Sequence, residues 1–590
     1  MASFGRIIQN GGESRPADIL RHRRTAHRLR PISLLLATLG WLSLPSFAQV
    51  PANALPMGGQ VSAGQAAIAQ SGAALRIDQS TARAVIDWQS FNIGRDASVH
   101  FNQPSTSSIA LNRVGADGGR SIIDGRLTAN GQVWLLNPGG VMFGPTARVD
   151  VGGLLAGSLK LGNDDFMSGN YRFGKDGAGS IVNQGTLTAA DSGYIALLAP
   201  EVRNEGVVSA RLGTVVLASG DELRVDFSGD RLIEIKVDQA AVNGMIANKN
   251  LIEADGGWVL MSAGAASNLA AGAINNTGIV RASSFKEHAG AIRLEGGFIA
   301  LGGAISADGN AQTSGGAIQI AASRDLSLAD SVSARGLNGG SIDYRAGGRL
   351  IETATSQSDA SGQNDGGSIR MVADGGILSS GQYRATGATG QGGRIDLSGG
   401  SVRLLSATLD ASGNTQGGLV RIGGAFQGGK AQDTSSELYR NFIGRFGQLP
   451  DLPHAQRSFI NDSTRINVSS KVGAGGTAVV WSDTQTTFLG AIKAKGGSVE
   501  VSSAGDLRYV NLNGIDLGTG FLLLDPKDIE IGNFSAVSAW TQEAILGKGY
   551  SGGKNLDVVE LEGGVFTYPN NGDIFGRSVA LSRTSRNQKG

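Results

Sequence analysis

The sequence predicts an all-β fold, a parallel β-helix (solenoid) built from many similar coils. Two observations indicate this class. Glycine accounts for 91 of the 590 residues, about twice its usual share, while aromatic residues are only 6%. A double glycine followed by an alternating apolar strand also recurs through the middle of the chain. One such unit cannot bury its apolar face alone, so stacked copies are expected to share a core.

The repeat is clearest between residues 315 and 422. Successive copies are spaced by 24, 27, 26 and 25 residues and begin at Gly315, Gly339, Gly366, Gly392 and Gly417. Further copies begin at Gly296 and Gly496. In each copy the apolar residues alternate, which sends one side chain inward and the next outward. Glycine is expected to supply corners with positive φ. A period near 25 residues is typical of a β-helix with three short strands per coil.

The first 48 residues are predicted to be an extended secretory signal peptide. Seven arginines precede the apolar run Pro31–Leu44, and Pro45-Ser-Phe-Ala48 follows. A basic region, a short apolar region and small residues at the −3 and −1 positions form the usual pattern of such peptides. Cleavage is predicted between Ala48 and Gln49. A membrane anchor is the less favoured alternative, because the apolar run is short for a bilayer.

Composition excludes several classes of protein. Cysteine is absent, which excludes disulfides, thiolate zinc sites and iron–sulfur clusters. Seven of the 51 basic and two of the 50 acidic residues lie within residues 1–48, so the remainder carries a net charge of about −4. That balance does not predict a nucleic-acid partner. No later run of 18 apolar residues predicts a transmembrane helix. We expect no cofactor.

Little in the sequence predicts catalysis. H-E-x-x-H does not occur, Gly549–Gly553 is the one stretch with G-x-S-x-G spacing, and the histidines after residue 48 (His100, His288 and His454) are far apart. The adjacent acidic pairs are Asp164–Asp165 and Asp221–Glu222. Neighbours in a strand point to opposite faces, so neither pair predicts a polysaccharide-cleaving site. We therefore predict no catalytic residues, no metal site and no enzyme activity, with a carbohydrate-cleaving β-helix enzyme as an alternative.

Asparagine turns recur upstream of the double-glycine copies. Asn-x-Gly begins at Asn183, Asn204 and Asn276. Both residue types tolerate the left-handed backbone conformation, so these are turn signals. The asparagines could bind a metal or a sugar, but we favour an inward-facing ladder whose amides bond along the stack.

Residues 427–462 interrupt the repeat with aromatic residues, two prolines and a helix-compatible pattern. We predict a loop or small helical excursion from the solenoid. It is the best candidate for a specific contact, since functional loops are common on rigid scaffolds, with an inert insertion as the alternative.

Several motifs near the N-terminus resemble one family. They occur in order at Leu55–Gln60, Ile86–Gly94, Val99–Pro104, Ala110–Val114 and Ala129–Gly144, with later matches at Val480–Asp483 and Leu522–Ile529. Together they resemble the secretion domain, and later parts, of filamentous haemagglutinin-type exoproteins of two-partner secretion. The long basic signal region also resembles the extended signal peptides of that family.

The resemblance implies a domain order and a route. Residues 49–300 would be a two-partner secretion domain, a right-handed β-helix with an N-terminal cap. Residues 301–426 would continue it as the double-glycine repeat, 427–462 would form the extra-helical loop, and 463–590 further coils with a frayed or truncated end. A dedicated outer-membrane β-barrel transporter would export the chain through the periplasm to the medium or the bacterial cell surface.

Within that family the chain would act as a filamentous adhesin or haemagglutinin, with a host-cell or carbohydrate receptor that the sequence does not identify. A haem-acquisition exoprotein is an alternative. An autotransporter passenger is disfavoured, because the charged tail does not resemble membrane strands.

One family motif departs from its usual form. The family has Asn-Pro-Asn-Gly where this chain has Asn137-Pro138-Gly139-Gly140. The resemblance makes these four residues the candidate transporter-recognition and secretion motif, and a tight turn between coils is the alternative. Glycine can replace asparagine at a left-handed position without steric penalty, so the turn is expected to survive. The family's second motif, Asn-Pro-Asn-Leu, is not found.

Overall fold

The computed structural model describes residues 50–227, 234–239, 241, 244–263, 272–429, 437–525 and 578–581. The predicted signal peptide, its cleavage site between Ala48 and Gln49, and most of the chain after Asp525 lie outside these residues.

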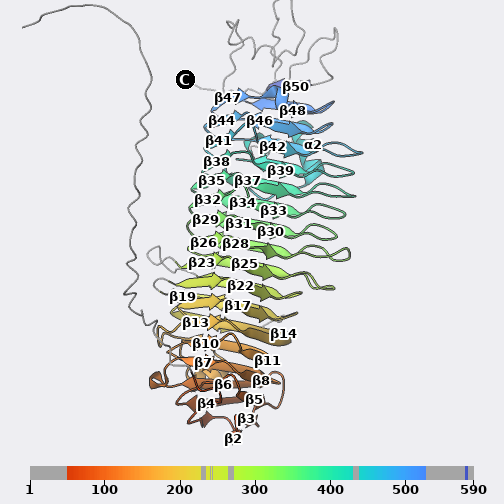
Figure 1. The fold of residues 1–590 in the computed structure, drawn as a ribbon. Helices are drawn as coiled ribbons and strands as arrows, with labels where there is room; N and C mark the ends of the chain where they lie inside the picture. The colour runs from red at the N-terminus through yellow and green to blue at the C-terminus, as the bar shows by residue number, and fades with distance from the viewer. Residues whose placement is uncertain are drawn as a thin grey trace, which may run out of the picture. The chain divides into compact units, whose positions relative to one another are not determined.

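Each coil contributes one short strand to each of three parallel sheets, here called sheets A, B and C, and the coils follow one another in sequence order (Figure 1). The long strands β11 and β14 each run through both sheet B and sheet A. The predicted parallel β-helix is confirmed by this strand pairing.

The strand bounds are as follows. Sheet A contains β4 (Arg83–Trp88), β6 (Ile109–Val114), β9 (Gln132–Leu136), β11 (Arg148–Gly157), β14 (Thr186–Leu198), β17 (Thr214–Ala218), β22 (Trp258–Ala263), β25 (Ala291–Gly296), β28 (Ala317–Ala322), β31 (Ser341–Ala346), β34 (Ser368–Ala373), β37 (Arg394–Gly399), β40 (Leu419–Ile422), β43 (Thr477–Val480), β46 (Ser498–Ser502), β49 (Phe521–Asp525) and β50 (Ser578–Leu581). Sheet B contains parts of β11 and β14 with β3 (Ala74–Gln79), β5 (Ser98–Asn102), β8 (Arg126–Ala129), β16 (Val207–Ser209), β21 (Leu251–Glu253), β24 (Ile279–Arg281), β27 (Ile305–Ser306), β30 (Ser331–Ser333), β33 (Gln357–Asp359), β36 (Gln382–Arg384), β39 (Thr408–Asp410), β42 (Arg465–Asn467), β45 (Ala491–Lys493) and β48 (Ile515–Asp516). Sheet C contains β7 (Ser121–Ile123), β10 (Val141–Phe143), β13 (Ile181–Asn183), β15 (Glu201–Asn204), β20 (Met245–Asn248), β23 (Ala273–Asn276), β26 (Phe298–Leu301), β29 (Leu326–Leu328), β32 (Arg349–Glu352), β35 (Gly376–Ser379), β38 (Ser401–Leu404), β41 (Arg457–Ile460), β44 (Gln485–Phe488) and β47 (Asp506–Val510).

The register of sheet A reproduces the repeat spacing. Ala317, Ser341, Ser368, Arg394 and Leu419 stack one above the other, which gives the same offsets of 24, 27, 26 and 25 residues as the double-glycine copies. The alternating apolar side chains of each copy fill one continuous core along the axis.

An N-terminal cap closes the first coil. Strand β1 (Gln60–Ala63) pairs antiparallel with β4, and β2 (Ala66–Ser71) pairs antiparallel with β3. These two strands occupy the sheet edges that the parallel stack would otherwise leave open.

The double glycines are required for a steric reason, and not for the positive-φ corners that the sequence predicted. The second glycine of each pair keeps an ordinary φ, so the prediction of positive-φ corners was wrong for these positions. A Cβ built on Gly367 would lie closer than 3.0 Å to the carbonyl oxygen of Gly340 in the preceding coil. The same relation to the preceding glycine holds at Gly152, Gly193, Gly213, Gly257, Gly316, Gly340, Gly393, Gly418, Gly476, Gly497 and Gly520. Glycine here permits close stacking of backbones.

The asparagine ladder lies inside the solenoid. Nδ2 of Asn183 donates to Asn204 at 2.8 Å, Asn204 donates to Asn248 at 2.8 Å, and Asn248 donates to Asn276 at 2.7 Å. All four side chains are fully buried. The sequence pattern identified three rungs and missed Asn248, because Asn250 rather than glycine follows it two residues later.

Two excursions cover the outer face of sheet A. The first contains α1 (Asn163–Ser168), β12 (Arg172–Phe173), β18 (Glu222–Asp226) and β19 (Glu234–Gln239), and it packs an aromatic cluster around Trp134. The second contains η2 (Phe426–Gly429) and α2 (Glu437–Phe446), and it packs on Leu419, Val479 and Trp481. The single-turn helices η1 (Ala116–Gly118) and η3 (Leu512–Gly514) complete the elements. Among the described helices, none has the length and apolar character needed to span a bilayer.

Candidate functional site

The four residues of the candidate secretion motif form a turn between β9 and β10. Asn137 is buried, and its Nδ2 donates to Gly119 O and to Ser121 Oγ, both at 2.8 Å. Its Oδ1 accepts from the backbone N–H of Gly139 at 2.8 Å. The Asn137 side chain is therefore fully used within the protein, and the surface of this turn consists of half-buried Pro138 and exposed Gly139.

Gly139, the motif residue that differs from the family pattern, does not have the left-handed backbone conformation. Gly140 has φ +88°, whereas Gly139 keeps an ordinary φ. A Cβ at Gly139 would lie 2.7 Å from the carbonyl oxygen of Gly119. The expectation that Gly139 occupies a left-handed position was wrong: the residue is close-packed against a neighbouring coil, and an asparagine there would require that coil to shift.

The acidic pairs and histidines do not form a reactive cluster. Asp164 and Asp165 lie in the first turn of α1 rather than in a strand, so the expected argument from strand alternation does not apply to them. Asp221 bonds to Lys175 at 2.7 Å. Within the described ranges, no three histidine, aspartate or glutamate side chains gather as a metal site would require.

The three histidines lie on different coils. His100 lies on β5 and its Nδ1 is 2.8 Å from Thr128 Oγ1, while His288 lies in an exposed turn. His454 is partly exposed, and its Nδ1 lies 3.0 Å from Oδ1 of Asp483.

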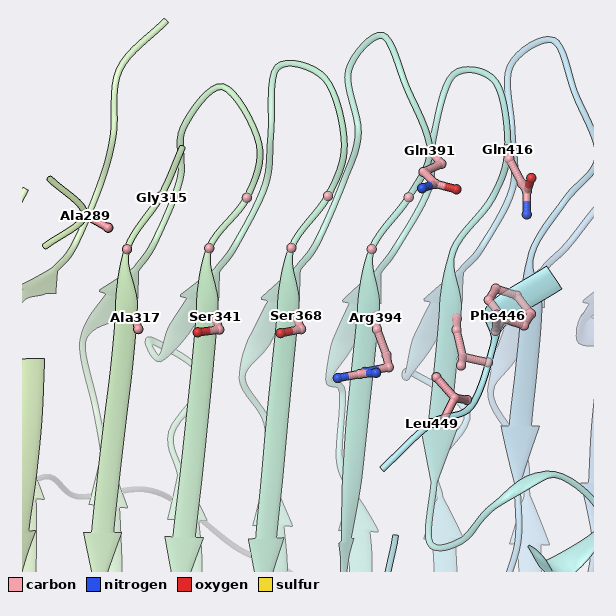
Figure 2. Close-up of a pocket in the computed structure, with 18 of the residues that line it drawn as sticks. Ala289, Gly315, Ala317, Ser341, Ser368, Gln391, Arg394, Gln416, Phe446 and Leu449 are labelled. Carbon is pink, nitrogen blue, oxygen red and sulfur yellow. The ribbon is translucent and has the colours of Figure 1, made fainter. Parts of the chain in front are cut away.

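A long groove of about 770 Å³ follows the corner where the double glycines lead into sheet A. It extends along the axis from the coil of Trp258 to the coil of Leu419, and the last turn of α2 contributes Phe446 at that end. Figure 2 shows Ala317, Ser341, Ser368 and Arg394 at the starts of successive strands. The floor is mostly backbone, because glycine occupies two lining positions in each of the four coils from β28 to β37.

The polar groups of the groove gather toward its C-terminal end. Gln391 and Gln416 lie at the bases of two successive loops, and Arg394 lies beside them at the start of β37 (Figure 2). Arg445, from the last turn of α2, also lines this end. No carboxylate is among the lining residues in the described part of the chain.

The two groove arginines differ in their partners. Arg394 Nε lies 3.2 Å from Asp396 Oδ2, but both oxygens of Asp396 accept hydrogen bonds from Arg421 at 2.8 Å. Arg445 Nη2 donates only to the carbonyl oxygens of Gly417 and Ala474, both at 3.3 Å. Burial lowers the pKa of the Arg445 guanidinium from its usual value, and its Nε has no hydrogen-bond partner among the described residues.

The excursion after β40 is held on sheet A by buried polar contacts. The Arg421–Asp396 pair is 3% and 0% exposed, and Arg421 also donates to Pro450 O at 3.3 Å. Arg370 donates to Asp451 O at 3.2 Å. These bonds fix residues 450–451 over sheet A, and with the packing of Phe442 on Phe426 they help to set the position of Arg445.

A second polar cluster lies inside the solenoid. Glu352 ends β32 and points into the core, at the position where Leu328 and Ser379 lie in the neighbouring coils. Burial raises the pKa of its carboxyl to about 7, against the opposing effect of hydrogen bonds such as the one from Ser356 Oγ at 3.1 Å. The nearby Tyr344 hydroxyl bonds to Ser358 at 2.7 Å. No sequence pattern singles out this buried acid.

Stacked parallel coils, an antiparallel cap and the ordered N-terminal motifs define a β-helical protein with the organisation of a secretion domain. Residues 52–320 match the family model described as the TPS secretion domain. Residues 52–320 therefore form a TPS secretion domain, the N-terminal domain of two-partner secretion exoproteins. Proteins of this route cross the outer membrane with the help of a partner transporter.

Relatives and a solved structure resemble parts of the chain. A Heme/hemopexin-binding protein of Haemophilus influenzae is 34% identical over 238 residues, covering 39% of this chain and 25% of that protein. A second protein of that name and species is 43% identical over 99 residues, covering 17% of this chain and 11% of that protein. The chain thus spans a quarter or less of the length of these relatives. The crystal structure of the HMW1 secretion domain from Haemophilus influenzae has a TM-score of 0.43 and 24% identity, covering 80% of this chain and 100% of that one.

Proposed function

We propose that this chain is a non-enzymatic adhesin of the filamentous haemagglutinin type, delivered to the medium or cell surface of a Gram-negative bacterium. The secretion domain carries this proposal, because a TPS domain directs a chain to an outer-membrane transporter.

The proposed organisation follows the sequence boundaries. Residues 1–48 form the signal peptide removed between Ala48 and Gln49, and residues 49–300 form the secretion domain. Residues 301–426 and 463–590 extend the solenoid, and residues 427–462 form the excursion. This extended body would present binding surfaces away from the cell.

A secretion assay tests the export step. The tagged chain is expressed in a Gram-negative host with and without its candidate transporter, and the medium is analysed by mass. We expect transporter-dependent appearance of residues 49–590. Equal amounts in the medium without the transporter would contradict the proposed route. Binding of the purified chain to epithelial cells, compared with a denatured sample, then tests the adhesin role.

Within the motif Asn137–Gly140, only the exposed residues are proposed to contact the transporter. Asn137 shapes the turn through its three hydrogen bonds, and the transporter would contact the exposed surface at Pro138–Gly139, with Gly140 fixing the backbone. A substitution at Pro138 therefore tests recognition more directly than one at Asn137.

A second candidate is haem or hemopexin binding. The names of the two Haemophilus influenzae relatives favour it. His454 offers one plausible ligand, because its Nδ1 faces the Asp483 carboxylate and this arrangement leaves Nε2 to coordinate iron. Haemin titration followed at the Soret band tests it. Saturable binding that His454→Ala abolishes would support this function, and no spectral shift would exclude it.

A further inference from the structure

We propose that the groove along the glycine corner binds an acidic, linear polysaccharide lying along the solenoid axis, with its anionic groups on Arg394 and Arg445. This inference rests on the proposed binding function and names a ligand class for it. Three observations support it: the shape of the groove, the partners of the two groove arginines, and the hydrogen bonding of the groove floor.

The shape suits an extended polymer. The groove passes seven coils of sheet A, from β22 to β40, at about 4.8 Å per coil. Its floor has few side chains in the four coils from β28 to β37, since glycine pairs such as Gly339–Gly340 and Gly366–Gly367 line it there. Trp258 at one end is 37% exposed, and Phe446 lies at the other. A linear chain can therefore lie flat between two aromatic side chains.

The charge of the groove predicts an anion. Around its C-terminal end, Arg394 and Arg421 share the single carboxylate of Asp396. Arg445 makes no ion pair among the described residues and only two long hydrogen bonds to carbonyl oxygens. A partly desolvated guanidinium gains most from an anionic partner, because screening by water is weak there. Arg394 and Arg445 lie about one to two coils apart, roughly 5–10 Å along the axis.

The floor disfavours a peptide. A peptide bound by strand addition needs free backbone groups along a sheet edge. Here the glycine N–H groups are already used: Gly340 donates to Ala334 O at 2.7 Å and Gly367 donates to Ala360 O at 2.8 Å. The groups left to meet a ligand are the hydroxyls of Ser341 and Ser368 with the amides and guanidiniums near the α2 end. Sugar hydroxyls and pendant anions match these donors and acceptors.

Affinity measurements on the full exported chain test the proposal with four probes. Polygalacturonate supplies carboxylates, dextran sulfate supplies sulfates, dextran is the neutral backbone, and poly-L-glutamate is an acidic peptide. We expect binding to at least one acidic polysaccharide, which identifies the anion, and at least tenfold weaker binding to dextran and poly-L-glutamate. Equal affinity for either of these two, or no binding to both acidic polysaccharides, would overturn the proposal.

Two variants and a control locate the site. The double substitution Arg394→Gln with Arg445→Gln should weaken binding at least tenfold, and Ser368→Trp should do the same by filling the groove without changing charge. Arg403→Gln with Arg457→Gln removes the same charge from the exposed face of sheet C and should leave affinity within twofold. A control that loses as much affinity as the groove variant would overturn the assignment.

Thermal unfolding of each variant separates loss of the site from loss of the fold. Cell binding distinguishes the two proposals. If the chain binds cells but no acidic polysaccharide, the groove assignment fails and the adhesin function stands.

Discussion

Truncating an interior rung of the asparagine ladder should destabilise the solenoid far more than truncating its last rung. Asn204 occupies an interior position. It accepts from Asn183, donates to Asn248 and to Leu251 O at 3.2 Å, and its Oδ1 also accepts from the buried N–H of Gly206 at 3.3 Å. Asn204→Ala removes all four bonds at once.

The size of the destabilisation depends on which buried groups lose their only hydrogen-bond partner. After Asn204→Ala, Oδ1 of Asn248 and the N–H of Gly206 are buried without a partner, while Asn183 keeps Val207 O at 3.3 Å. A buried unsatisfied group costs about 1–3 kcal/mol, so two give about 4 kcal/mol.

The last rung provides the matched control. Asn276→Ala removes one acceptor from Asn248, whose amide keeps the carbonyl oxygens of Asn250 at 3.2 Å and Ile279 at 3.3 Å. No donor is left unpaired, and under-satisfied carbonyl groups are better tolerated. We expect a loss of about 1 kcal/mol for this variant.

Native-state hydrogen exchange on the exported chain measures the local opening free energy. Asn204→Ala should lower it by about 4 kcal/mol in β13, β15 and β20, and leave distant coils such as β34 unchanged, because each coil contacts only its neighbours. Equal losses for the two variants, or losses spread evenly along the solenoid, would refute the reasoning.

Three further changes test other parts of the argument. Gly367→Ala should destabilise its coils by about 3 kcal/mol through overpacking, while Gly115→Ala, with open space and an extended backbone, should be neutral or slightly stabilising in denaturant unfolding. The pKa of Glu352 is about 7 in the folded chain, against 4.5 for an unperturbed glutamate, so stability should fall by about 3 kcal/mol as pH rises through this window, and Glu352→Gln should remove that dependence in pH-resolved melts. Pro138→Ala should lower transporter-dependent secretion with an unchanged melt, whereas Asn137→Ala should lower both, and unchanged secretion for both would contradict the recognition proposal.

Much of the fold could be predicted because its repeat is written directly in the sequence. The spacing of the double glycines equals the strand register, since both arise from the length of one coil. The physical role of glycine could not be predicted in the same way. A local pattern suggests a turn, whereas the close approach of Gly367 to the Gly340 carbonyl joins residues 27 positions apart.

The candidate groove depended on contacts that no local pattern contains. Residues 427–462 could be recognised in the sequence as an interruption of the repeat. Their docking on sheet A, through Arg421 and Asp396, could not be recognised there, and it is this docking that brings Arg445 beside Gly417. Likewise, Asn137 was recognisable as part of a motif, but its burial against Gly119 and Ser121 became visible only in the folded chain.

The bonds between coils also have a direction along the chain. In most ion pairs between successive coils, the acid belongs to the earlier coil and the base to the later one: Asp87–Arg113, Asp191–Arg211, Glu205–Lys249, Asp255–Arg281, Asp308–Arg335, Asp325–Arg349 and Asp396–Arg421, with His454–Asp483 and Lys495–Asp516 reversed. Apart from the buried Asp396–Arg421 pair, these pairs are partly exposed and contribute little stability individually. Their order nevertheless means that the edge of a folded stack presents carboxylates to the basic side chains of the next coil. The second glycine of each pair packs on the preceding coil, as Gly367 does on Gly340, whereas the first packs against the following coil, as Gly339 does on Ala360. Each coil therefore finds its register from its immediate neighbours, which allows a chain that folds from its capped N-terminal end to add coils one at a time.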